Sequence, residues 1–185
     1  LVITGDPGAA VARETYLVGV NENAGTWTLD PDEGTADDEE IVLFTGLEPV
    51  DTDTPAAVFD AILSGTIDQA TIEDGGLLGG ASALRVVDGG GTFETFQFAN
   101  KTTARIMGQS GADQFTVNYT TAAAGLTDLE VYGHVEEHVL GQPADDDASE
   151  TFDLNRTADI TTSIFGQGGS DLVENVGGDL NAATS

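Results

Sequence analysis

The feature that most constrains the fold is a short frame that occurs twice, 58 residues apart. Residues 105–115 read R-I-M-G-Q-S-G-A-D-Q-F, and residues 163–173 read S-I-F-G-Q-G-G-S-D-L-V. Each copy predicts a strand, a corner in which glycines permit positive φ, an aspartate that caps the corner, and a second strand. Such units, repeated along a chain, are typical of a parallel β-solenoid that gains one coil per repeat.

Three weaker copies extend the pattern. One covers the start of the chain, residues 3–12. Another begins at Val131 and Gly133 and puts His138 at the aspartate position, 25 residues after the first strong copy and 33 before the second. The most degenerate copy spans residues 63–72. The spacing is irregular, which predicts that loops are inserted at some corners.

The Gly-x-x-Gly-x-Asp-x-apolar frame resembles the calcium-binding nonapeptide of RTX-type β-roll proteins, in the degenerate form seen in large bacterial or archaeal surface proteins and adhesins. This resemblance implies calcium at Asp113 and Asp171. The turn glycines it implies are Gly108, Gly111, Gly166 and Gly169. The sequence departs from the family where Gln109 and Gln167 replace a glycine, and it has no tandem nonapeptides. The alternative is that both aspartates only cap turns.

The N-terminal part has strand signals of a less regular kind. Residues 15–20 and 26–29 are rich in β-branched and aromatic side chains, and the segment between them predicts a hairpin loop. The continuous apolar run 41–44 predicts a strand buried on both faces. Residues 51–65 fit either a short helix, with proline at its first position, or a strand.

We therefore expect an all-β protein, with a right-handed parallel β-solenoid or β-helix and a less regular β-region before it. Residues 1–64 form the irregular region or the N-terminal coils, and residues 65–185 form the repeats, with one continuous domain as the alternative. The period of two in the later strands predicts that their aromatic side chains stack in the core. These are Phe93, Phe96, Phe98, Phe115, Phe152 and Phe165.

The charge of the chain excludes several partners. It has 33 acidic residues, 5 lysines and arginines together, and a net charge of -28. Nucleic acids and anionic membranes are poor partners, because phosphates need Lys and Arg. High salt, bound calcium or an exposed surface role would each tolerate such acidity, which is typical of halophilic proteins. The chain has no cysteine, which excludes disulfides and thiolate chemistry.

Residues His134 to His138 fit the H-x-x-E-H pattern of inverted zinc proteases, or a transition-metal pair formed by the two histidines. That chemistry needs a helix, whereas this segment follows a strand and Gly133, so we expect an ordinary loop or strand edge. Three N-x-T sequons would permit glycosylation at Asn100, Asn118 and Asn155.

We expect the chain to be a module at the cell surface or outside the cell, such as a stalk, surface-layer, filament or adhesin segment, and not an enzyme. Its partners would be neighbouring repeats or copies of itself stacked end to end, because the ends of a solenoid are open strand edges. The alternative is a calcium-dependent module that binds surface glycans. A β-helix enzyme that degrades polysaccharides is the third class, but the few arginines are too scattered to serve an acidic sugar.

Overall fold

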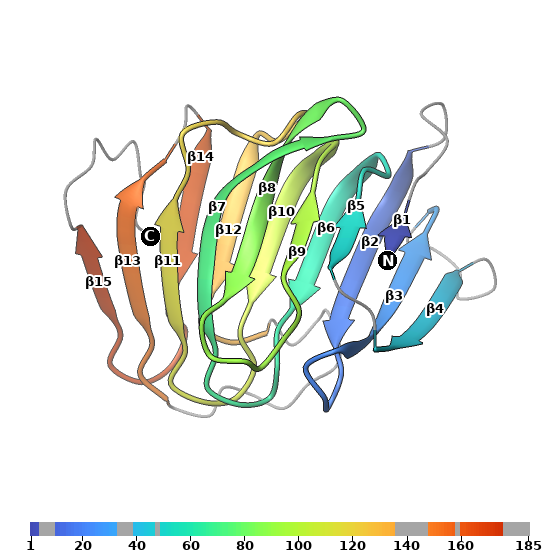
Figure 1. The fold of residues 1–185 in the computed structure, drawn as a ribbon. Helices are drawn as coiled ribbons and strands as arrows, with labels where there is room; N and C mark the ends of the chain where they lie inside the picture. The colour runs from blue at the N-terminus through green and yellow to red at the C-terminus, as the bar shows by residue number, and fades with distance from the viewer. Residues whose placement is uncertain (4–9, 33–38, 47–48, 136–147, 158–159, 176–185) are drawn as a thin grey trace.

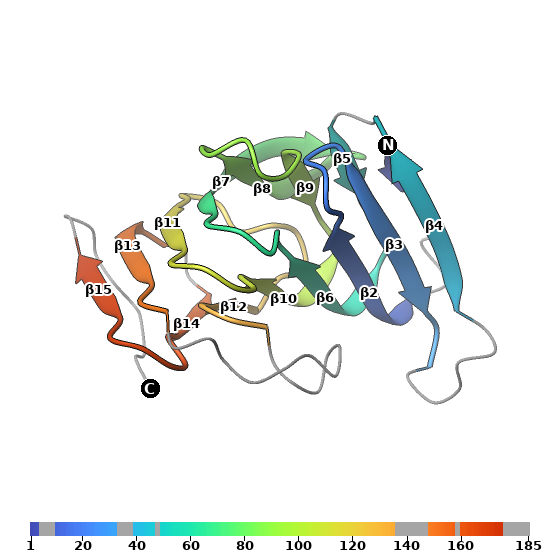
Figure 2. The ribbon, with the colours of Figure 1, turned by 90° about the horizontal axis from the view of Figure 1, so that it is seen from below.

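The computed structural model describes residues 1–3, 10–32, 39–46, 49–135, 148–157 and 160–175. These residues form two stacked β-sheets and no helix, so the predicted all-β class is confirmed (Figures 1 and 2). The eight-stranded sheet contains, in spatial order, β1 (Val2–Ile3), β5 (Val50–Thr52), β9 (Phe96–Phe98), β8 (Ala81–Asp88), β7 (Gln69–Leu78), β11 (Gln114–Asn118), β13 (Thr151–Arg156) and β15 (Leu172–Asn175). The seven-stranded sheet contains β14 (Thr161–Phe165), β12 (Asp128–Tyr132), β10 (Lys101–Met107), β6 (Ala56–Ile62), β2 (Val11–Val18), β3 (Ala24–Asp30) and β4 (Glu40–Thr45).

From β9 onward the chain crosses from one sheet to the other at every strand. Strands β10, β12 and β14 join the seven-stranded sheet, where β10 pairs with β6, β12 with β10 and β14 with β12, all in parallel. Strands β11, β13 and β15 join the eight-stranded sheet, where β11 pairs with β7, β13 with β11 and β15 with β13, also in parallel. Two antiparallel excursions precede this order, namely β2–β3–β4 and β7–β8–β9. Both sheets are therefore mixed and not purely parallel. The right-handed parallel solenoid stays a prediction.

The strand register reproduces the offsets of the sequence repeat. Ile106 pairs with Val131, 25 residues later, and Val131 pairs with Ile164, 33 residues later. The degenerate copy was predicted two residues out of register, because Ile106 pairs with Ala61 and not with Leu63, and Phe115 pairs with Ala70 and not with Ile72. Insertions lengthen the corners between strands while the pairing across each strand stays in phase. The copy at residues 3–12 lies largely outside the described residues.

The main hydrophobic core lies between the two sheets. Alternate residues of each strand point inward, as a period of two requires. The core contains five of the six phenylalanines that we expected to find there, while Phe165 packs elsewhere. Phe115 and Phe152 stack at 5.4 Å, across neighbouring parallel strands.

Phe165 belongs to a second cluster on the opposite side of the seven-stranded sheet. Its ring stacks on Tyr132 at 4.4 Å, and Met107 and Ile62 continue the same row. These residues each follow an inward-facing residue in their strand, so they point outward. Val135, which follows β12, packs on this row and is itself buried.

The N-terminal expectations were partly correct. The hairpin is confirmed as β2 and β3, and residues 51–65 form strands β5 and β6, so the helix interpretation was wrong. The prediction for residues 41–44 was also wrong. This segment is the edge strand β4, in which only Phe44 is buried and Leu43 is 79% exposed. A continuous apolar run does not distinguish a central strand from an edge strand.

Candidate functional site

The repeated glycines and acids lie together where the chain passes from the seven-stranded sheet to the eight-stranded sheet. A glycine directly follows the last residue of each of β10, β12 and β14, at positions 108, 133 and 166. An acidic residue directly precedes β11, β13 and β15. Because these strands pair in register, the corners stack along one side of the molecule and form a glycine–acid ladder.

The first glycine of each frame is required by space. A Cβ on Gly108 would overlap the Asp113 carboxylate and the Gly133 carbonyl, and one on Gly166 would overlap Asp171. A Cβ on Gly133 would lie 2.6 Å from Glu150 Oε2 and 2.7 Å from the Gly166 carbonyl oxygen. The acid of each corner therefore fills the volume that a side chain on its own glycine would need.

The second glycine is required by backbone conformation. Gly111 and Gly169 have φ of 118° and 82°, in the region that favours glycine. The predicted positive φ thus holds for these two positions and not for the first glycines. The first glycine provides room, and the second turns the chain.

Asp113 and Asp171, the two acids predicted to cap turns, each accept a hydrogen bond from the neighbouring corner. Asp113 Oδ1 accepts the backbone N–H of Asp68 at 2.9 Å, and Asp171 Oδ1 accepts the N–H of Glu150 at 3.1 Å. Asp113 is fully buried, whereas Asp171, which directly precedes the edge strand β15, is exposed. The bond joins two successive copies of the repeat, which a cap within one turn would not do.

The assignment of His138 to the acid position was wrong. Thr151 pairs with Gln114, so the residue beside Asp113 is Glu150, at the end of the long connection after β12. His138 itself lies outside the described residues. The prediction assumed a fixed spacing between the glycine and the acid, whereas the connection from Gly133 to Glu150 is longer.

The glutamine that directly follows the first glycine of each strong frame has a structural role. Gln109 Nε2 donates to the Leu63 carbonyl of the adjacent corner. Gln167 Oε1 accepts the backbone N–H of His134 at 2.6 Å. Both side chains thus bond backbone groups of the neighbouring corner.

No group of three acidic, histidine or cysteine side chains arranged to hold a metal occurs among the residues described. Calcium at Asp113 and Asp171 stays a prediction that arises from the family resemblance. His134 directly follows a strand and Gly133, as expected, and is buried with its Nδ1 at 3.0 Å from the Val135 carbonyl oxygen. Its predicted partner, His138, lies outside the described residues.

The sequons differ in their surroundings. Asn100 adopts a φ of 62° and its amide donates to the Asp53 carbonyl at 2.9 Å. Asn118 ends β11 and is exposed, and Asn155 is half-buried in β13. Of the three residues, Asn118 alone is exposed.

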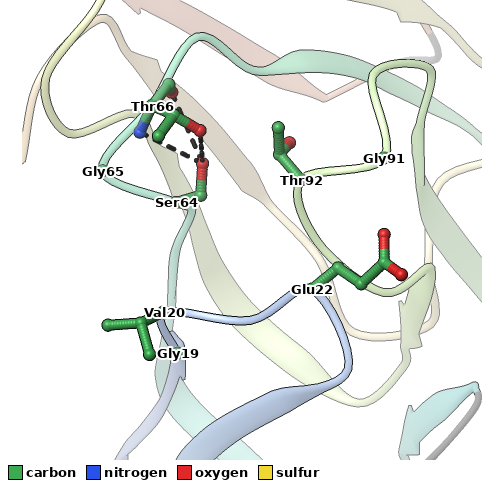
Figure 3. A pocket seen from close by; sticks show the side chains of 8 residues that line it. All are labelled: Gly19, Val20, Glu22, Ser64, Gly65, Thr66, Gly91 and Thr92. Carbon is green, nitrogen blue, oxygen red and sulfur yellow. Dashed lines mark hydrogen bonds between the residues drawn. The ribbon is translucent and has the colours of Figure 1, made fainter.

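A small pocket opens where the β2–β3, β6–β7 and β8–β9 loops converge (Figure 3). Its volume is about 350 Å³, and its lining residues are Gly19, Val20, Glu22, Ser64, Gly65, Thr66, Gly91 and Thr92. Asp68 is buried and accepts hydrogen bonds from two of these residues, Ser64 at 2.6 Å and Thr92 at 2.5 Å. Burial raises the pKa of the Asp68 carboxyl, and the two hydroxyls oppose this only in part.

A charged cluster lies in the core, and no sequence pattern predicted it. Lys101, the only lysine, is fully buried with its Nζ on Glu14 Oε2 and on the Thr54 carbonyl. Glu14 Oε1 accepts hydrogen bonds from Trp27 Nε1 and Thr52 Oγ1, each at 2.7 Å. These residues come from five strands and corners, so only the folded chain brings them together.

Two arginines that seemed scattered in the sequence meet on the outer face of the seven-stranded sheet. Arg13 pairs with Asp60, and Arg105 lies 3.8 Å from the same carboxylate. Arg105 also donates to Glu130 at 2.8 Å. Strands β2, β6, β10 and β12 lie side by side in this order. Basic and acidic side chains therefore alternate from each of these strands to the next.

The molecule is thus an all-β protein of two stacked sheets joined by a glycine–acid ladder. No family model, curated protein or solved structure matches the chain. Within the described residues no helix is long and apolar enough to cross a membrane.

Proposed function

We propose that the chain is a structural module of the cell surface or extracellular space, a right-handed β-solenoid segment that stacks end to end with copies of itself. A stalk, surface-layer protein, filament or adhesin would be built from such segments. The regular crossing between sheets and the stacked glycine–acid corners support the solenoid. The proposal assigns the module no catalysis.

The observation that carries the proposal is that apolar interior positions are exposed at both ends. Val42 lies directly across from the core residue Trp27, and Val173 directly across from Phe152, so both valines face the interior side of their sheets. They are nevertheless 41% and 45% exposed, because no further described strand covers β4 or β15. The core of the stack ends in open edges, which are templates for pairing with another chain.

The directions of the edge strands suit head-to-tail stacking. In the seven-stranded sheet, two antiparallel steps separate β4 from β2, so β4 runs in the direction of the parallel set that ends with β14. In the eight-stranded sheet, β1 and β15 also share one direction, because two antiparallel steps lie between them. A second copy placed at either end would therefore continue both sheets with parallel pairs (Figure 1).

The charge sets the conditions for stacking. Two copies that each carry -28 repel one another at low salt, and screening shortens the range of that repulsion to about 3 Å at molar salt. We expect self-association to strengthen as sodium chloride is raised. This dependence agrees with a halophilic or extracellular setting for the module.

The test is light scattering of the purified chain across protein concentration in low and molar sodium chloride. The unmodified chain is expected to form species larger than a monomer in molar salt, and Val42→Lys or Val173→Lys to reduce them, since an inward-pointing charge blocks an edge. Leu77→Lys is the matched control, because Leu77 is 75% exposed on β7, away from both ends. A monomer at every concentration and salt level would contradict the proposal.

A second candidate, a calcium-dependent glycan-binding module, is supported by the pocket. Its lining offers the hydroxyls of Ser64, Thr66 and Thr92 and the carboxylate of Glu22, groups that hydrogen-bond sugar hydroxyls. A glycan-array signal that is lost with chelator and with Glu22→Gln would favour this candidate. A signal that survives both changes, or no signal, would count against it.

A further inference from the structure

We propose that Lys101 and Glu14 form an internal amide cross-link between β10 and β2. The two residues are 87 positions apart, and both side chains are fully buried. Their strands lie on either side of β6 and pair with it. The link would join β10 and β2 covalently across the strand β6 that lies between them, in a chain that has no cysteine.

The environment disfavours the ion pair. A charged pair without water must recover the cost of its lost hydration, and this cost falls if both charges are removed. Phe59 lies 5.6 Å from Lys101 Nζ, and Trp27 and Thr52 enclose Glu14. Burial lowers the pKa of the Lys101 ammonium, although Glu14 opposes the shift, so the nucleophilic amine is more accessible than in water.

The contacts match what amide formation requires. Nζ contacts Oε2, while Oε1 accepts two hydrogen bonds, from Trp27 and Thr52. Those two donors are placed to stabilise the negative charge that develops on Oε1 when Nζ attacks Cδ. Holding amine and carboxyl together in the folded core replaces a bimolecular encounter.

The step balances within the pair. A proton passes from the Nζ ammonium to Oε2, and the neutral amine attacks Cδ to form the N–C bond, with the negative charge on Oε1. A second proton moves from nitrogen to Oε2, the Cδ–Oε2 bond breaks, and Oε2 leaves as water. One ammonium and one carboxylate thus give one amide and one water, with no oxidant or other reagent.

The product would satisfy the hydrogen bonds of the site. The amide oxygen would be Oε1, which keeps Trp27 and Thr52 as donors. The remaining N–H would keep the Thr54 carbonyl as its acceptor, which Nζ already contacts. A buried ion pair would become a buried neutral group with its partners in place, which the low dielectric of the core favours.

The primary experiment is the intact mass of the folded chain, taken in denaturant after incubation in molar sodium chloride over a range of pH. The proposal expects a mass lower than that of the sequence by one water molecule, and tandem mass spectrometry should locate the link at Glu14 and Lys101. Lys101→Arg keeps the charge but supplies no amine, so it should keep its full sequence mass. Folded, unmodified chain that retains its full mass at every pH would overturn the proposal.

A second measurement separates chemistry from folding. Thr52→Val removes one donor to Oε1 and should slow the loss of water on the order of 100-fold. Thr54→Val is the matched control, because the Thr54 hydroxyl is buried with no hydrogen bond and only its carbonyl contacts the lysine. If the two folded variants lose water at equal rates, the assigned role of Thr52 is wrong.

Discussion

At the scale of single residues, the glycines of the ladder serve two different physical needs. Gly111 and Gly169 supply positive φ, whereas Gly108, Gly133 and Gly166 leave room for an acid and for the next corner's backbone. The two needs predict different effects of a methyl group. At the second kind of position the cost comes from crowding alone, since φ is not in the left-handed region.

Gly133→Ala is expected to lower the free energy of unfolding by about 1–3 kcal/mol, the usual cost of overpacking. The new Cβ would lie 2.7 Å from the Gly166 carbonyl oxygen, which belongs to the backbone and cannot turn away. Gly65→Ala is the control, since its nearest neighbour would be Ser110 Oγ at 3.9 Å. Urea denaturation of both variants gives the comparison, and equal stabilities would contradict the crowding argument.

Asp68 gives a pH prediction. Burial raises the pKa of its carboxyl in the folded chain above the ordinary value of 3.8, so the folded state holds its proton more tightly than the unfolded state. The stability that this group contributes is present below the unfolded pKa and is lost as pH rises toward the folded pKa. Asp68→Asn should therefore gain stability relative to the unmodified chain as pH rises above about 4. Thermal melts from pH 3 to 7 measure the difference, and a constant or shrinking difference would contradict this sign.

Individual residues also mark the limit of sequence reasoning. Asp113, Asp171 and the turn glycines were identified because their order along the chain is short and fixed. Glu150 was missed because an insertion separates it from its glycine, and Glu14 and Lys101 because they meet only through tertiary pairing. Local patterns reveal corners, whereas a contact that spans several strands leaves no spacing to read.

At the scale of elements, the bonds between successive corners couple each strand pair to the next. Asp113 at the start of β11 holds the N–H of Asp68 at the start of β7, and Asp171 holds Glu150 before β13. The first bond is buried inside the stack, and the second lies at its end. Their contributions to stability should therefore differ.

Asp113→Ala is expected to cost about 1–3 kcal/mol, because it leaves the buried N–H of Asp68 without its acceptor. Asp171→Ala removes an equivalent bond near solvent, where water can replace the carboxylate, and should cost less than about 1 kcal/mol. Chemical denaturation of the two variants supplies the test. An equal cost at both positions would show that the ladder is not graded from core to end.

Element types were predictable where side-chain alternation was strong, as in β10, β11 and β14. The repeat offsets even gave the register of three strands. The hairpin of β2 and β3 was predictable, whereas the antiparallel pairing of β7, β8 and β9 and the edge position of β4 were not. Residues 41–44 have the same apolar composition as a buried strand. Which strand ends a sheet depends on what is absent beside it, and a single strand's sequence does not record that.

At the scale of the whole molecule, net charge and open ends act against each other. The acidic surface disfavours association, and the apolar edges Val42 and Val173 favour it. Salt decides the balance, since it screens the first and leaves the second intact. The same screening should also stabilise the monomer against its own repulsion.

The melting temperature is expected to rise with sodium chloride and to gain no more from millimolar calcium than from sodium chloride of equal ionic strength. The reason is that one carboxylate oxygen of Asp113 and one of Asp171 already accept a backbone N–H, as the turn-capping alternative to calcium requires. Circular dichroism melts with chelator, calcium and salt provide the comparison. A large gain specific to calcium would instead support RTX-like metal sites.

The most direct measurement of head-to-tail stacking uses two engineered thiols in this cysteine-free chain. Leu43→Cys on β4 and Ser163→Cys on β14 place one thiol at each end of the seven-stranded sheet. With a short bis-maleimide in molar sodium chloride, head-to-tail stacking predicts a ladder of multimers for the double variant and only monomer for each single variant. Dimers from the single variants, or no cross-linking of the double variant, would contradict it.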